Sequence, residues 1–149
     1  MFPPRRILRK RPLGILMVGI FLLVGTVIAI VTGISFSHPG TFLDALWNLN
    51  RTAYLQFAIL GKLAGYLLLG IAAVTALACY GLLKGRTWGW WMAVAIFAVN
   101  GAGDAVNIFA GEPRKGIAGL LIAGCFLLYL FRPVTKAFFE GSAATAHNR

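Results

Sequence analysis

Four apolar stretches, each long enough to cross a lipid bilayer, occupy most of this chain of 149 residues. They run over residues 13–36, 57–83, 88–110 and 116–131, and the most apolar part of the second begins at Leu63. A hydrocarbon core about 30 Å thick is spanned by about 20 helical residues, because a helix rises about 1.5 Å per residue. The fourth stretch reaches this length only with its flanking residues. The pattern predicts a protein surrounded by lipid.

The apolar stretches are expected to be helices. Charged residues make up 12% of the chain, against about 25% in soluble domains. In lipid the backbone must be hydrogen-bonded internally, so a spanning segment is a helix or a strand of a closed barrel. Barrel strands alternate in polarity, and Ile15–Val24 and Gly65–Cys79 do not. The sequence therefore predicts an all-α integral membrane four-helix bundle over residues 13–131, a basic terminus over 1–12 and an amphipathic or disordered tail over 132–149.

The basic residues are unevenly divided between the two ends of the predicted spans. Ten of the fourteen lie on the side of the two termini: Arg5, Arg6, Arg9, Lys10, Arg11, Lys84, Arg86, Arg132, Lys136 and Arg149. The positive-inside rule then places both termini in the cytoplasm. The net charge of +10 thus indicates a membrane surface and not nucleic acid. Arg5, Arg6, Arg9, Lys10 and Arg11 are expected to contact anionic lipid head groups, at about 1 kcal/mol each.

The first external loop, residues 37–56, is expected to contain a short helix that lies flat on the outer membrane surface. Thr41 and Asp44 form a weak capping box. Apolar residues after it share one side of the helix, and Trp47 is expected at head-group level as an interface anchor. A lid over a ligand is the alternative interpretation of this segment.

Trp88, Trp90 and Trp91 follow the basic turn at residues 84–86 and begin the third apolar stretch. Tryptophan is enriched at membrane interfaces, where its ring sits between lipid and water. We interpret the three residues as interface anchors. The alternative, an aromatic cage for a ligand, is less consistent with their place at the end of a span.

The third stretch contains a stripe of polar side chains. Asn100, Asp104 and Asn107 stand at i, i+4 and i+7 with Gly103 between them, which places them on one side of a helix. Ionisable residues in spans face the protein interior or water. Lys62, at the outer edge of the second stretch, is within reach of Asp104.

In one interpretation the stripe joins helices, with an ion pair between Lys62 and Asp104. In the other it lines a vestibule where Asp104 binds a cation or relays a proton. The shallow depth of Asp104 favours the first, since carrier sites lie near the midplane.

Nothing else in the sequence is arranged for catalysis. We find no Ser/His or Cys/His pairing, no paired carboxylates and no phosphate-binding loop. Two cysteines within predicted spans are read as packing residues, and no metal or cofactor is expected. The sequence therefore predicts a non-enzymatic structural or accessory membrane component. A small transporter or proton- or cation-linked protein using Asp104 is the alternative.

Two segments carry a resemblance to a known group of proteins. Gly81–Trp91 reads GLLKGRTWGWW, and Asn100–Asn107 reads NGAGDAVN. These resemble a pattern in small uncharacterised bacterial inner-membrane proteins with four spans, a GR-x-WG turn and an N-x-x-GD-x-x-N third helix. The resemblance implies a bacterial cytoplasmic membrane and no particular activity. The lipid bilayer is the expected partner, and either a second copy or another membrane protein is left open.

Overall fold

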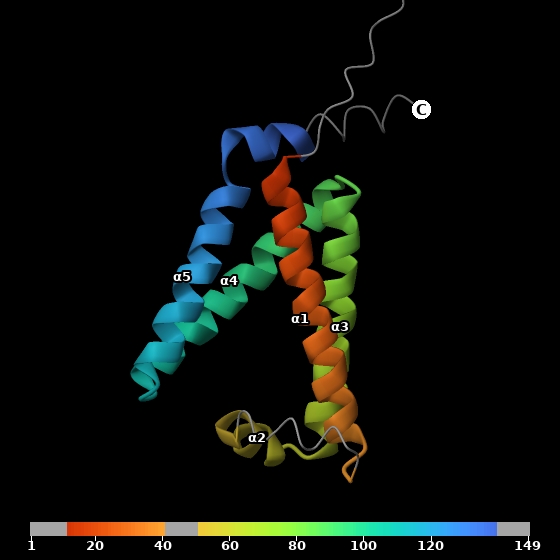
Figure 1. The fold of residues 1–149 in the computed structure, drawn as a ribbon, viewed down its shortest axis with the longest axis vertical. Coiled ribbons are helices and arrows are strands. Elements are labelled where there is room, and N and C mark those ends of the chain that lie inside the picture. Colours follow the sequence, from red (N-terminus) through yellow and green to blue (C-terminus); the bar gives the residue numbers. More distant parts are fainter. Residues whose placement is uncertain (1–11, 41–50, 140–149) are drawn as a thin grey trace, which may run out of the picture. The chain divides into compact units, whose positions relative to one another are not determined.

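The protein is all-α in a computed structural model that describes residues 12–40 and 51–139 (Figure 1). The labelled helices are α1 (Leu13–Ser37), α2 (Arg51–Ala58), α3 (Lys62–Leu83), α4 (Thr87–Phe109) and α5 (Pro113–Leu130). Residues 133–139 are also helical. Trp47 and the basic residues Arg5, Arg6, Arg9, Lys10 and Arg11 lie outside the described residues, and so does most of the helix expected in the first external loop.

Helices α1, α3, α4 and α5 are each long and apolar enough to cross a membrane. Their ends lie within three residues of the predicted ones except at the second span. There, residues 57 and 58 belong to α2, and α3 begins only at Lys62. The separate helix α2 was not predicted, because Arg51–Ala58 was expected to belong partly to the external loop and partly to the second span. The break falls at Gly61, whose φ of +53° is a left-handed conformation that favours glycine.

The surface of these four helices is mostly apolar. In the most apolar 18-residue segment of each of these helices, only 17–33% of the segment is buried inside the protein. Large side chains such as Met17, Leu121 and Leu128 are more than 60% exposed. A water-soluble protein of this size rarely exposes a continuous apolar surface, whereas lipid solvates one. The structure therefore describes a multi-span membrane protein.

The chain divides into two compact units. One, the α1–α3 unit, comprises residues 20–80, and the other, the α4–α5 unit, comprises residues 1–19 and 81–149. In the α1–α3 unit, α1 and α3 approach closely at Gly33 and Gly65. A Cβ atom on Gly65 would lie 2.8 Å from the Gly33 carbonyl oxygen. Glycine at this position therefore allows the two backbones to touch, as small residues do between membrane helices.

Several threonine and serine hydroxyls of this unit bind their own helices. Thr26 donates a hydrogen bond to the Leu22 carbonyl (2.9 Å), Ser37 to Gly33 (2.8 Å) and Thr75 to Ile71 (2.8 Å). Each bond joins residues four apart along one helix. A hydroxyl satisfied in this way can lie in lipid without a partner helix.

In the α4–α5 unit, α4 and α5 form an antiparallel pair. The rings of Phe97 and Phe126 lie 4.9 Å apart, and Gly101 packs against Ala123. Near the other end of the pair, the first turn of α1 joins them, because Gly14 packs directly against the Tyr129 ring. The contact between α4 and α5 thus combines aromatic rings with small residues.

Helix α3 ends in a Schellman motif, which begins the turn to α4. The Arg86 amide donates to the Gly81 carbonyl (2.9 Å) and the Gly85 amide to the Leu82 carbonyl (3.0 Å). Gly85 has φ +68°, the left-handed conformation this motif requires. Beyond the turn, Gly89 lies so close to Gly81 that a Cβ on either residue would overlap the other's backbone. The basic turn predicted from the sequence is therefore a tight, hydrogen-bonded corner.

Candidate functional site

Asp104 lies half-buried on the side of α4 that faces α5. Its carboxylate rests on Gly119, where an added Cβ would overlap both carboxylate oxygens. One turn away, Gly116 packs in the same way against the Asp104 carbonyl oxygen and Ile108. The two glycines, three residues apart, leave a space on α5 that the acid fills. An ionisable side chain is therefore held between two spanning helices.

Asn100 and Asn107 do not share this position. Both are exposed, and Gly103 between them has open space around its Cα, with no atom within 4 Å of where a Cβ would stand. The residues of α4 that contact α5 include Phe97, Gly101, Asp104 and Ile108 instead. The predicted stripe thus divides, with Asp104 at the α4–α5 contact and the asparagines on an outward face. We call Asn100, Gly103 and Asn107 the polar face of α4.

Lys62 is the first residue of α3 and lies in the α1–α3 unit, whereas Asp104 lies in the α4–α5 unit. The ion pair between them stays a prediction. Among the described residues, an ion pair at the start of α5 joins Lys115 and Glu112, with Nζ and Oε2 2.6 Å apart. It links residues three apart on an exposed turn, so it contributes at most about 1 kcal/mol.

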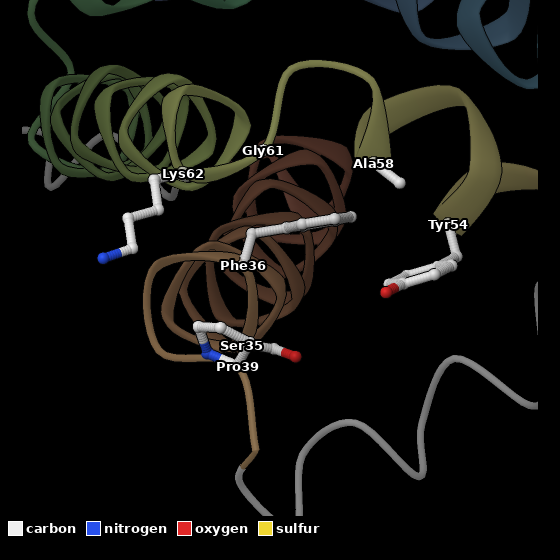
Figure 2. A pocket seen from close by; sticks show the side chains of 7 residues that line it. All are labelled: Ser35, Phe36, Pro39, Tyr54, Ala58, Gly61 and Lys62. Carbon is white, nitrogen blue, oxygen red and sulfur yellow. The ribbon is translucent and has the colours of Figure 1, made fainter.

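Lys62 lines a pocket of about 200 Å³ in the α1–α3 unit (Figure 2). Phe36 and Tyr54 point toward one another across it, with nearly parallel rings whose centroids lie 5.6 Å apart. The Lys62 side chain extends away from Tyr54, on the other side of the Phe36 backbone. The remaining lining residues are Ser35, Pro39, Ala58 and Gly61. Among the described residues, the lining contains a hydroxyl, a phenol and an ammonium group beside two aromatic rings, which suits a small amphiphile.

The three tryptophans of α4 divide into two kinds. Trp88 is 45% exposed and Trp91 is 59% exposed, whereas only 6% of Trp90 is exposed. The Trp90 indole N–H donates a hydrogen bond to the Leu130 carbonyl (3.1 Å) at the end of α5. The anchor role predicted for all three is consistent with the exposure of Trp88 and Trp91, while Trp90 belongs to the protein interior. Trp90 lies four, seven and eleven residues before Val94, Phe97 and Gly101, so it shares the buried side of α4 with them. This spacing could have indicated that Trp90 is buried.

A second pocket, of about 210 Å³, lies beside Trp90 and was not predicted. It is lined by Thr87, Trp90, Trp91, Phe131, Lys136 and Phe139. Residues 132–139 were expected to belong to the tail, and no contact between them and the tryptophans was predicted. The pocket exists because residues 133–139 fold back to bring Phe139 to Thr87, whose hydroxyl lies 3.5 Å from the Phe139 carbonyl oxygen.

Comparisons with protein-family models, with curated proteins and with solved structures find no match for this chain. The resemblance of the Gly81–Trp91 and Asn100–Asn107 segments to small bacterial inner-membrane proteins therefore stays a prediction. The chain's own residues indicate a multi-span membrane protein in which Asp104 lies at the contact between α4 and α5.

Proposed function

We propose that this chain is a non-enzymatic, structural or accessory component of a bacterial cytoplasmic membrane, with both termini in the cytoplasm. In this role α4 presents its polar face to a helix of another membrane protein. The proposal rests on the need of polar side chains in a spanning helix for hydrogen-bond partners, and not on any catalytic arrangement.

The observation that carries the proposal is the exposure of Asn100, Gly103 and Asn107. An amide side chain that faces hydrocarbon leaves its donors and acceptors without partners, which is unfavourable. Asparagines between membrane helices instead bond across the contact, for about 0.6 kcal/mol each on average. The open space at Gly103 lets a second backbone approach between them. A face built in this way suits a helix–helix contact better than it suits lipid.

Site-specific photocrosslinking in native membranes tests this contact. A benzoylphenylalanine residue is introduced at Val99, which is 72% exposed beside the polar face, or at Leu128, which is 74% exposed on α5. We expect an adduct with a different membrane protein from position 99 and not from position 128. The adduct should be lost in the variant Gly103→Leu and kept in Gly124→Leu, since a Cβ at either glycine meets no neighbour within the chain.

Three results would contradict the accessory role. Crosslinks that join position 99 only to α1 or α3 of the same chain would mean that the chain covers its own polar face. An adduct of twice the chain's mass would mean that the face joins two copies. Equal adducts at positions 99 and 128 would mean that the polar face has no preference for protein.

A second candidate function, proton- or cation-linked transport through Asp104, is favoured by the position of that carboxylate. Acids inside spanning segments commonly mark ion or proton pathways, and Asp104 is held at the α4–α5 contact by two glycines. Proteoliposomes loaded with a pH-sensitive dye and given a membrane potential separate the two functions. Transport requires a flux above that of empty vesicles that Asp104→Asn abolishes without loss of folded protein. The accessory role requires no such flux.

A further inference from the structure

The pocket beside Trp90 has rigid aromatic walls. The Trp90 ring meets the rings of Trp91 and Phe131 edge to face, with centroids 4.7 and 5.6 Å away. Such edge-to-face pairs are favourable arrangements of aromatic rings. The Trp90 hydrogen bond to Leu130 and the burial of Phe139, which is 2% exposed, hold the walls in place. The apolar surface of the pocket is therefore formed before anything binds.

One corner of the pocket carries positive charge. The Lys136 ammonium lies 5.0 Å from the centroid of the Phe131 ring, a cation–π distance. Three further basic residues, Lys84, Arg86 and Arg132, lie at this same end of α3, α4 and α5. The two acidic residues that the structure describes in this unit, Asp104 and Glu112, lie toward the opposite end of α4 and α5. Glu140, which follows Phe139 in the sequence, lies outside the described residues, and the four basic residues outnumber it. An anion is thus favoured at this end.

The location and size of the pocket restrict what could occupy it. It lies where α4 begins and α5 ends, at the end of two spanning helices, so the lipid head groups are adjacent to it. Its volume of about 210 Å³ is below the roughly 300–1,000 Å³ of pockets that enclose a drug-sized ligand. A head group with the start of its acyl chains fits this size, with aromatic rings beside the apolar part and the ammonium beside the anion.

We propose that this pocket binds the phosphodiester group of an anionic phospholipid. Lys136 pairs with the phosphate, and Trp91 and Phe131 cover the glycerol and the first acyl carbons. This goes beyond a general attraction of basic residues to the membrane surface, because it assigns one pocket and one cation. It does not depend on the accessory role, which concerns the polar face of α4.

Native mass spectrometry of the full chain in detergent tests the proposal, with phosphatidylglycerol, phosphatidylcholine and inorganic phosphate as separate probes. We expect phosphatidylglycerol to bind more tightly than phosphatidylcholine. Lys136→Gln should weaken phosphatidylglycerol binding about tenfold or more, the factor that corresponds to losing one hydrogen bond to a charged group. Lys84→Gln is the matched control, because it removes the same charge from the same end without touching the pocket.

The aromatic walls have their own matched pair. Trp91→Leu should weaken phosphatidylglycerol binding, whereas Trp88→Leu should not, although both tryptophans are exposed and only Trp91 lines the pocket. Equal losses in Lys136→Gln and Lys84→Gln would overturn the proposal in favour of general surface attraction. Equal binding of phosphatidylcholine would overturn it as well. Displacement of the lipid by millimolar inorganic phosphate would overturn the lipid assignment and leave a site for free phosphate.

Discussion

At the scale of single residues, glycines decide where the helices touch. Gly33, Gly65, Gly89, Gly116 and Gly119 each lie against a neighbouring residue so closely that a Cβ would overlap it. Gly25, Gly61 and Gly124, which stand four or eight residues from Gly33, Gly65 and Gly116, a spacing that predicts the same side of a helix, have open space around them. The spacing therefore predicts that close contacts exist but does not select the glycines that make them. Apolar side chains suit lipid and protein interior equally, so hydrophobicity does not distinguish the two faces of a spanning helix.

The corner between α3 and α4 gives the sharpest prediction at this scale. Gly89→Ala should lower the free energy of unfolding by about 1–3 kcal/mol, the cost of forcing extra atoms into a packed contact. The added methyl would meet the Gly81 backbone, which cannot move aside as a side chain can. Unfolding by sodium dodecyl sulfate in mixed micelles, followed by circular dichroism, measures this change.

Gly103→Ala is the matched control, since the same methyl added to the same helix would meet open space. Its free energy of unfolding should be unchanged or higher by up to about 1 kcal/mol, because alanine is a better helix former than glycine. If both variants lose equal stability, the helix itself and not the α3–α4 contact is sensitive to the change, and the close approach at Gly89 is wrong.

At the scale of elements, α4 and α5 show how much of the fold the sequence predicts. The start of α5 lies at Pro113, three residues before the predicted one, because proline at the first helical position lacks only an N–H that has no partner there. The predicted span began at Gly116 because Arg114 and Lys115 are charged, and charge does not prevent a helix from starting. By contrast, the placement of Asp104 against Gly119 and of Trp90 against Leu130 depends on how two helices meet, which no pattern within one helix contains.

The bond between Trp90 and Leu130 gives a prediction for this helix pair. Trp90→Phe keeps an aromatic ring but removes the indole N–H, and the Leu130 carbonyl loses its side-chain donor. We expect a loss of about 1 kcal/mol in the free energy of unfolding. Trp91→Phe, on the exposed side of the same turn, should change it by less than about 0.5 kcal/mol. A loss in Trp91→Phe as large as in Trp90→Phe would contradict the assignment of Trp90 to the interior.

At the scale of the whole molecule, the exposed apolar surface establishes lipid as the surrounding medium, and the charges predict the orientation. Both come directly from the sequence, because lengths of apolar segments and positions of Lys and Arg need no tertiary structure to be read. Contacts between distant segments do need it. The pocket that joins Thr87, Phe131 and Lys136 was missed for this reason, since its parts are more than 40 residues apart.

Labelling of single cysteines tests the orientation. In a chain with Cys79→Ala and Cys125→Ala, we expect a membrane-impermeant maleimide to label Arg114→Cys in intact spheroplasts. Lys84→Cys should react only after the membrane is opened, because the positive-inside rule places the turn it belongs to on the cytoplasmic side. Labelling of Lys84→Cys in closed spheroplasts, with Arg114→Cys protected, would invert the topology.

A double-mutant cycle tests the ion pair predicted between Lys62 and Asp104. Lys62→Met and Asp104→Leu should each destabilise the protein, and the double variant should be more stable than the sum of the two losses implies. We expect a coupling energy of about 1 kcal/mol, the scale of polar contacts between membrane helices. The cycle uses the same detergent titration, and strictly additive losses would mean that the two residues do not interact.

The corner between α3 and α4 also has a consequence for how the protein is made. Only residues 84–86 separate the two helices, and their glycine backbones touch just beyond the bend. Such a connection gives neither helix room to enter the bilayer alone, so both must insert together as a hairpin during synthesis. In the predicted topology the positive charges at the bend remain on the side of the ribosome, because moving Lys84 and Arg86 through hydrocarbon would be costly.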